Sequence, residues 1–473
     1  MNVAGNRAQE STKHRGAVAA AGGTVRNTKS TAERLLATGR PKTTSSTPTD
    51  KSMGVLEDII NPLNLNAAYR KVRQNRGSGG VDRMTVDELL PYLKLHGGEI
   101  VRDLLDGRYM PCPVRRVEIP KDNGKMRQLG IPTAVDRVIQ QAIAQVLTPA
   151  YEPQFVNTSY GFRPKRGAHD AIRKCQEYLN AGYVWTVDMD LEKFFDTVNQ
   201  SKLLEVLART VKDGRVVSLI SKYLRAGVVK CGRFEETTVG VPQGGPLSPL
   251  CANIILNELD HELERRGHRF VRYADDMVIF CKSKASAQQT LEHIIPFIEG
   301  KLFLKVNREK TVVAYAGKIK FLGYGFYKGK KGFGMRVHAK SVAKMQAKVR
   351  ELTDRRRLRT KEEWTKAQRL FVQGWVNYFK LADMASLMER TDEWMRRRIR
   401  MVFLKRWKKC GTKYRNLKAL GLSEDDARKI AFSRKGVWHT AKCYEISRAL
   451  PNDRLQRAGF EYFSTYYRSV HVA

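Results

Sequence analysis

Two adjacent acidic residues, Asp275 and Asp276, lie between two short, mostly apolar segments, residues 270–272 and 277–280. Apolar runs of this length with a tight polar break predict a β-hairpin whose turn presents both carboxylates to one site. Such a pair, with a third carboxylate on a neighbouring strand, can bind two Mg²⁺ ions for in-line phosphoryl transfer. The sequence Tyr-Ala-Asp-Asp alone is weak evidence, because four-residue matches are common.

The third carboxylate is expected upstream of this hairpin. Residues 184–189 have the apolar character of a buried strand, and Asp190 follows directly. A strand that ends there places the Asp190 carboxylate at the edge of the sheet. Asp188 is the runner-up for the same role. Alternatively, Asp188, Asp190 and Asp196 are solvated loop acids, but an apolar strand leading into them makes that interpretation hard to sustain.

A proline- and glycine-rich loop lies between these two acidic segments, at residues 241–250. Two glycines between prolines allow the backbone to approach a ligand closely. Gln243 can hydrogen-bond to that ligand without adding charge. An apolar helix is expected to begin at Ser248 or Pro249. A plain loop before a helix is the alternative, and the neighbouring acidic segments make it less favoured.

Three basic residues are candidates for contact with phosphate. Lys121 and Arg127 lie on a predicted hairpin, residues 117–132, where they could clamp an incoming triphosphate. The alternative is a solvated basic hairpin. Lys310 could protonate a leaving pyrophosphate, although lysines are abundant in this chain and this assignment is weaker.

The charge of the chain indicates a polyanionic partner. Its 473 residues contain 86 Lys and Arg against 48 Asp and Glu, a net charge of +38. Phosphate contacts release counterions, so nucleic acid suits this excess. An unspecific basic surface, as in a ribosome-associated protein, is the alternative.

The seven cysteines form no Cys-x-x-Cys pair, so a structural zinc site is not expected. Unpaired cysteines suit a reducing cytosol. No run of about 18 apolar residues is present, which predicts a protein without a membrane span.

The character of the chain changes twice along its length. Residues 1–50 contain eight basic and three acidic residues with little periodicity and predict a disordered basic tail. After about residue 335 the pattern becomes helical and basic, and residues 391–473 contain 20 Lys and Arg against 8 acids. A separate nucleic-acid-binding module is the simplest account of this last part. Aromatic residues spaced along helix faces precede it: Trp364, Phe371, Trp375, Tyr378, Phe379 and Trp394.

In this order, the motifs resemble the ordered sequence blocks of reverse transcriptases. The residues within the motifs are similar to those of group II intron-encoded proteins. The likeness spans roughly residues 54–470. The matching blocks are Gly-Ser-Gly-Gly-Val-Asp (77–82), the hairpin at 119–132, Ser-Tyr-Gly-Phe-Arg-Pro (159–164), Asp-Leu-Glu-Lys-Phe-Phe-Asp (190–196), Pro-Gln-Gly-Gly (242–245), Tyr-Ala-Asp-Asp (273–276) and Phe-Leu-Gly-Tyr (321–324).

This resemblance implies a role for every candidate residue except Lys310. Asp190, Asp275 and Asp276 match the catalytic and metal-binding triad of a two-Mg²⁺ site. Phe195 matches the position under the sugar of the deoxynucleoside triphosphate, where a ring would clash with a ribose 2′-OH. Lys121 and Arg127 match the positions that contact the triphosphate. Gln243 matches the position beside the nascent base pair. Residues 321–323 match the primer grip.

The helical part of the chain carries the second half of the resemblance. Residues 373–379 are similar to the Gly-Trp-x-Asn-Tyr signature of the maturase thumb, or X domain. Residues 406–409, 433–438 and 462–467 are similar to the DNA-binding region of the same family. Core packing is the alternative for each Trp and Tyr, while some of the Lys and Arg between them should face phosphate.

The predicted fold is therefore an α/β (α+β) right-hand polymerase. Fingers and palm contain a small antiparallel sheet, and an all-α thumb and a basic helical C-terminal domain follow. The expected divisions are a basic tail (1–50), an N-terminal extension (51–114), fingers and palm (115–334), the thumb (335–395) and a DNA-binding domain (396–473).

The expected function is RNA-directed DNA synthesis by a mobile group II intron protein that also binds the intron RNA to assist splicing. Expected partners are the intron RNA, an RNA template with a DNA primer, target DNA and deoxynucleoside triphosphates. We expect no membrane contact and a cytoplasmic location, with nucleoid association in bacteria. The sequence leaves the oligomeric state open, a homodimer included.

Two further interpretations remain open. One is a retron-like or phage-defence reverse transcriptase, and the other is a splicing-only RNA-binding protein with an inactive polymerase. The printed chain also lacks the paired cysteines and histidines of the HNH endonuclease that many family members carry. Priming from a nick or a replication-fork strand is therefore expected.

Overall fold

The computed structural model describes residues 54–471, except for residues 121–123, 125 and 357–359. The predicted basic tail at 1–50 and Lys121 lie outside the described residues. None of the helices formed within the described ranges combines the length and apolar character needed to cross a lipid bilayer.

A four-stranded antiparallel sheet carries the acidic residues. Its strand order is β6-β7-β3-β8. The predicted hairpin and the predicted strand before Asp190 are both confirmed. The strands are β3 (Trp185–Met189), β6 (Arg269–Tyr273), β7 (Asp276–Cys281) and β8 (Val312–Tyr315).

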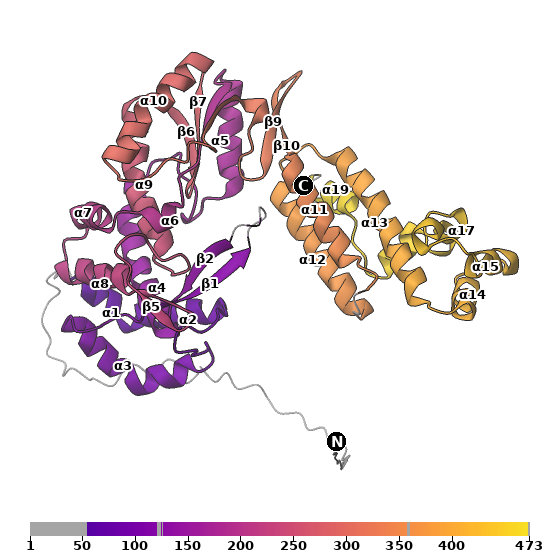
Figure 1. The fold of residues 1–473 in the computed structure, drawn as a ribbon, viewed down its shortest axis with the longest axis horizontal. Helices are drawn as coiled ribbons and strands as arrows, with labels where there is room; N and C mark the ends of the chain where they lie inside the picture. The colour runs from indigo at the N-terminus through magenta and orange to yellow at the C-terminus, as the bar shows by residue number, and fades with distance from the viewer. Residues whose placement is uncertain (1–53, 121–123, 125, 357–359, 472–473) are drawn as a thin grey trace, which may run out of the picture. The chain divides into compact units, whose positions relative to one another are not determined.

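Helices cover both faces of this sheet (Figure 1). Successive side chains of a strand point to opposite faces. Met277 and Ile279 belong to one apolar core together with residues of α9 (Ser248–Arg265) and α10 (Lys284–Gly300). Val278 and Phe280 belong to a second core that includes α5 (Ala168–Asn180). The strands are therefore packed against helices on both faces, and this packing fixes the positions of the strand ends.

A second sheet, in the order β2-β1-β4-β5, contains the predicted basic hairpin. Its β1 and β2 strands pair in antiparallel fashion, as expected from the sequence. The strands are β1 (Val114–Pro120), β2 (Met126–Ile131), β4 (Val228–Lys230) and β5 (Arg233–Glu235). Besides α5, the α-helices between residues 55 and 225 are α1 (Val55–Ile60), α2 (Pro62–Gln74), α3 (Leu89–Leu105), α4 (Ala134–Tyr151), α6 (Phe194–Thr197), α7 (Gln200–Thr210) and α8 (Gly214–Arg225).

Two local features lie outside these sheets. The Thr85 amide donates to the Glu88 carboxylate at 2.8 Å, directly before α3 begins at Leu89. A separate strand pair consists of β9 (Tyr324–Gly329) and β10 (Gly332–Val337). Residues 321–323 form a tight turn, because Leu322 and Gly323 both adopt positive φ angles.

The C-terminal part of the chain is helical, as predicted. Its last helix, α19, packs against α12 and α13. The buried Asp392 carboxylate accepts the backbone N–H groups of Phe463 and Ser464 at 2.9 and 2.8 Å, which caps α19 from another helix. The helices are α11 (Ala339–Leu352), α12 (Lys361–Phe379), α13 (Ala385–Arg406), α14 (Cys410–Ala419), α15 (Glu424–Ala431), α16 (Val437–Thr440), α17 (Tyr444–Ala449), α18 (Asn452–Arg457) and α19 (Phe463–His471).

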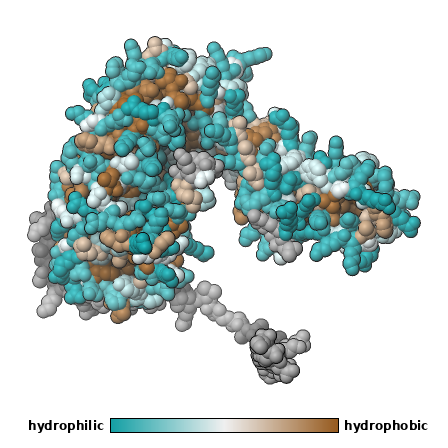
Figure 2. Space-filling view, in the orientation of Figure 1, coloured by the Kyte–Doolittle hydropathy of each residue, from teal (hydrophilic) through white to brown (hydrophobic). Residues whose placement is uncertain are grey.

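The predicted boundary after residue 395 lies inside α13, and the domain limits stay predictions. Figure 2 shows that the visible face of the protein is mainly hydrophilic. Such a surface suits the large number of charged residues.

Candidate catalytic site

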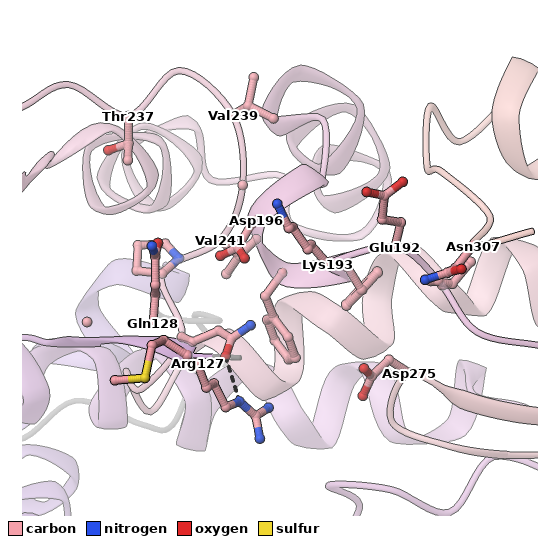
Figure 3. Close-up of a pocket in the computed structure, with 18 of the residues that line it drawn as sticks. Arg127, Gln128, Glu192, Lys193, Asp196, Thr237, Val239, Val241, Asp275 and Asn307 are labelled. Atoms are coloured by element: carbon pink, nitrogen blue, oxygen red, sulfur yellow. Dashed lines mark hydrogen bonds between the residues drawn. The ribbon is translucent and has the colours of Figure 1, made fainter. Parts of the chain in front are cut away.

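One cavity of about 780 Å³ brings most of the predicted site residues together. It is lined by the β1–β2 hairpin, the segment after β3, the loop before α9 and the turn between β6 and β7 (Figure 3). Seven of the eight candidate residues line it: Arg127, Asp190, Phe195, Gln243, Asp275, Asp276 and Lys310. The eighth, Lys121, is not among the described residues.

Strand register explains how the three carboxylates meet. Met189 on β3 lies opposite Met277 on β7, so continuing the pairing by one residue places Asp190 across from Asp276. Asp275 occupies the turn between β6 and β7, directly after the left-handed residue Ala274.

Two carboxyl groups, those of Asp276 and Asp188, have raised pKa values, because they are buried and repelled by neighbouring carboxylates. Withdrawal from water, together with the negative charges of Asp275 and Asp190, raises the pKa of Asp276 to about 6. Solvent reaches the Asp276 side chain, but it lies within the crowded cavity, where protein replaces much of the surrounding water. Asp188 responds in the same way, since burial and the charges of Asp276 and Asp190 raise its pKa to about 6. The arrangement concentrates negative charge that a cation would relieve.

Asp190 is held by a lysine in this structure. The Lys310 ammonium donates to both Asp190 oxygens, at 3.2 and 3.0 Å. Among the described residues, no three His, Cys, Asp or Glu side chains are placed closely enough to form a ready-made metal site. The carboxylates therefore share a cavity without forming a preassembled metal cage, and Lys310 balances part of their charge.

A buried ion pair holds the acidic turn, and sequence reasoning missed it. Arg272 and Asp260 are both fully buried. The Arg272 Nε donates to the two Asp260 oxygens at 2.8 and 2.9 Å. Its Nη1 donates to Asn253 Oδ1 and to the Ala274 carbonyl, each at 3.0 Å. An arginine inside an apolar strand was the available signal, because a buried charge requires a partner.

The segment at residues 158–161 supports the same turn. Backbone hydrogen bonds of 2.9 Å run from the Tyr160 amide to the Arg272 carbonyl and from the Arg272 amide to the Thr158 carbonyl. A Cβ atom added to Gly161 would lie 2.2 Å from the Ala274 nitrogen. Only glycine allows this close approach of the two backbones.

The opposite wall of the cavity is built from the Pro-Gln-Gly loop and the basic hairpin. Arg127 Nε donates to Gln243 Oε1 at 3.1 Å, shown as the dashed line in Figure 3. The Gly130 amide donates to the Gln243 carbonyl at 2.7 Å. Gly244 has a φ of +122°, and a Cβ atom there would lie 2.4 Å from the Gly130 oxygen. These contacts fix Gln243 next to β2.

Phe195 forms a wall of the cavity from the short helix α6. Its side chain is buried, with 8% of the residue exposed. The chain turns into α6 through Lys193, which has a positive φ of 45°. The Val241 amide donates to the Phe195 carbonyl at 2.7 Å, so the Pro-Gln-Gly loop and α6 are connected.

Comparison with known proteins identifies two families within the chain. Residues 119–326 match the model described as "Reverse transcriptase (RNA-dependent DNA polymerase)". Residues 342–421 match "Group II intron, maturase-specific domain". The two matches follow one another in the order expected from the motifs.

Individual proteins are similar to parts of this chain. Protein YkfC of Escherichia coli strain K12 is 35% identical over 335 residues, which cover 61% of this chain and 88% of YkfC. Group II intron-encoded protein LtrA of Lactococcus lactis subsp. cremoris is 31% identical over 363 residues, 62% of this chain and 58% of LtrA. The alignment thus leaves more than a third of LtrA unmatched. A chain of the "Partial Cas6-RT-Cas1--Cas2 complex" is 26% identical, with a TM-score of 0.35 over 53% of this chain and 43% of that one.

Proposed function

Because this chain belongs to the group II intron-encoded reverse transcriptases, we propose that it copies RNA into DNA and that its C-terminal helices bind the parent intron RNA to assist splicing. The family implies nucleic-acid partners, and the net charge of +38 suits phosphate contacts. The observation that carries the polymerase role is the convergence of Asp190, Asp275 and Asp276 with Arg127 and Gln243 in one cavity.

Divalent cations are the cofactor class of this family, and we propose Mg²⁺ as the ion and Asp190, Asp275 and Asp276 as its ligands. Mg²⁺ commonly uses one or two carboxylates together with substrate phosphates, so a preassembled protein cage is not required. Burial, together with repulsion from Asp275 and Asp190, raises the pKa of Asp276, which fits a site completed by cations. Bound Mg²⁺ would supply charge that stabilises the attacking and leaving oxygens.

Other side chains of the cavity would bind the substrate and transfer a proton. Arg127 would hold the triphosphate through its guanidinium group, and Lys121 would assist it. Gln243, fixed beside β2, would contact the new base pair. Phe195 would lie under the sugar and exclude a 2′-OH by its bulk. Lys310 would move from Asp190 to the leaving pyrophosphate and donate a proton to its oxygen.

The maturase role rests on the match at residues 342–421 and on the basic helices after it. We propose that these helices recognise the intron RNA by its shape and its phosphates, while the RNA itself carries out the splicing chemistry. Binding of target DNA by the basic C-terminal region would allow retrohoming by target-primed reverse transcription. These partners favour a cytoplasmic location at the nucleoid.

Replacement of Asp275 tests the polymerase role. Asp275→Asn should abolish primer extension on an RNA template but leave RNA affinity unchanged, because it removes a metal ligand and no phosphate contact. Asp58→Asn is the matched control, since it makes the same charge change at an exposed position in α1 outside the cavity. Normal DNA synthesis by Asp275→Asn would show that the site assignment is wrong.

Sequencing the RNA that copurifies with the protein from its own cells tests the maturase role. We expect a single excised intron that contains this reading frame. A short structured non-coding RNA, or a random pool, would contradict the maturase role and favour a retron-like or defence enzyme. An intact wild-type protein that binds an intron but synthesises no DNA would instead indicate a splicing-only binder.

A further inference from the structure

Lys310 bonds one of the carboxylates that we assign to metal binding. Its ammonium group donates to both Asp190 oxygens, at 3.2 and 3.0 Å, and both residues line the cavity. Two other cations of the cavity wall bond glutamine side chains instead: Arg127 bonds Gln243 at 3.1 Å, and Arg116 bonds Gln128 at 2.7 Å. Lys310 therefore differs from these arginines in that its partner belongs to the acidic site.

The backbone around Lys310 is attached to the backbone of Asp190. The Asn307 amide donates to the Asp190 carbonyl at 2.9 Å, and the Asp190 amide donates to the Thr311 hydroxyl at 3.2 Å. The Thr311 amide closes this loop by donating to the Asn307 carbonyl at 2.9 Å. The starting point of the Lys310 side chain is therefore fixed, and only the side chain needs to move for its ammonium group to leave Asp190.

The pair of Lys310 and Asp190 is exposed enough to exchange partners. Their side chains are 60% and 35% exposed, whereas both members of the Arg272–Asp260 pair nearby are fully buried. Lysine carries its charge on a flexible stem with rotatable donors. Exposed ion pairs contribute little to the stability of a fold. The Lys310–Asp190 pair is therefore suited to a change of partner rather than to holding the palm together.

A metal ion and Lys310 would compete for the same oxygens. Mg²⁺ binds carboxylate oxygens at about 2 Å, and Lys310 lies within 3.2 Å of both Asp190 oxygens. An ammonium group and a divalent cation this close together repel each other strongly. A triphosphate in the cavity offers the displaced ammonium group new acceptors, because phosphate oxygens bind lysine. Metal entry is therefore opposed by Lys310 until such acceptors are present.

We propose that Lys310 is a resident counter-cation of the acidic site, which weakens metal binding at Asp190 until a nucleoside triphosphate gives its ammonium group another partner. Metal and nucleotide then bind cooperatively, because the nucleotide removes a competitor of the metal. By linkage, the metal strengthens nucleotide binding by the same factor. This inference rests on the proposed two-metal polymerase function. It concerns binding before the reaction and is distinct from proton donation to the pyrophosphate.

Binding of Mn²⁺ to the full-length protein without nucleotide tests this proposal, with electron paramagnetic resonance as the readout. Lys310→Met should bind Mn²⁺ about fivefold more tightly than the wild type, the upper range for loss of an exposed ion pair. Lys193→Met is the matched control, because it removes the same charge from the wall of the same cavity. Lys310→Arg keeps the charge. Neither the control nor Lys310→Arg should gain affinity.

Equal affinities of Lys310→Met and the wild type would overturn the proposal. An equal gain in Lys193→Met would do so as well, because the effect would then reflect the charge of the cavity rather than the bond to Asp190.

Amine labelling of the wild-type protein follows the displacement itself. Mg²⁺ alone should raise the rate at which acetic anhydride modifies Lys310, measured by mass spectrometry, while Lys193 keeps its rate. Unchanged labelling of Lys310 would refute the displacement. Loss of nucleotide incorporation in Lys310→Met at unchanged Mn²⁺ affinity would support proton donation alone and overturn the counter-cation role. A wild-type protein that binds Mn²⁺ but incorporates no nucleotide would instead refute the polymerase function.

Discussion

Gly161 should tolerate no side chain, and a single methyl group there should disable the site. A Cβ atom at this position would lie 2.2 Å from the Ala274 nitrogen, 2.9 Å from the Tyr273 carbonyl carbon and 3.0 Å from the Ala274 Cα. All three are backbone atoms, so no side chain can rotate away. Gly161→Ala must therefore displace either the 158–161 segment or the acidic turn.

The size of the displacement can be estimated from these distances. Non-bonded heavy atoms rarely approach within about 3 Å, so relief requires a shift of about 0.8 Å or more. The turn resists movement, because Arg272 holds the Ala274 carbonyl at 3.0 Å and is itself bonded to buried Asp260. A misplacement of about 1 Å at a reacting centre can cost about a hundredfold in rate. We expect Gly161→Ala to lower the single-nucleotide incorporation rate by about that factor.

Single-turnover primer extension, together with circular dichroism to confirm folding, measures this effect. Gly214→Ala is the matched control, because a Cβ at this first residue of α8 meets no atom within 4 Å. The control should retain its rate. A folded Gly161→Ala protein with a rate within threefold of wild type would refute the conclusion that this close approach positions the acidic turn.

Two further predictions concern residues around the same site. Asp260→Asn should lower the free energy of unfolding by about 3 to 5 kcal/mol, because it leaves the Arg272 charge buried without its partner. Urea unfolding measures this, and a change below about 1 kcal/mol would contradict it. Phe195→Ala should admit ribonucleotides, because it removes the bulk expected to clash with a 2′-OH. The ratio of kcat/KM for deoxy- and ribonucleotides tests this, and unchanged selectivity would place the discriminating contact elsewhere.

The elements that position the carboxylates could be predicted because their signals are local. Two apolar runs around Asp275 and Asp276 define the hairpin, and a third run ends at Asp190. The convergence of these acids with Gln243 and Arg127 followed from resemblance to a family, because no local pattern pairs Met189 on β3 with Met277 on β7, 88 residues later. The cavity brings them together.

Pairings between distant side chains could not be predicted in the same way. Lys310 was expected to act on pyrophosphate, but nothing in its local sequence indicated that it bonds Asp190 in the free protein. The turn at 321–323 was not indicated by the local sequence either. Its residues have the apolar and aromatic character of a strand, and the left-handed backbone of Leu322 depends on tertiary contacts.

Two turns, one directly before β7 and one directly before β9, are stabilised in the same way. Ala274 and Leu322 are both non-glycine residues with left-handed backbones, at φ of +57° and +49°. In each case a side chain holds the carbonyl of the strained residue: Arg272, two residues away, holds Ala274, and Tyr378 on α12 holds Leu322. Such backbone strain persists only where surrounding structure over-determines it, and it concentrates at functional sites. The geometry of the acidic turn therefore depends on Arg272 as well as on the carboxylates that it carries.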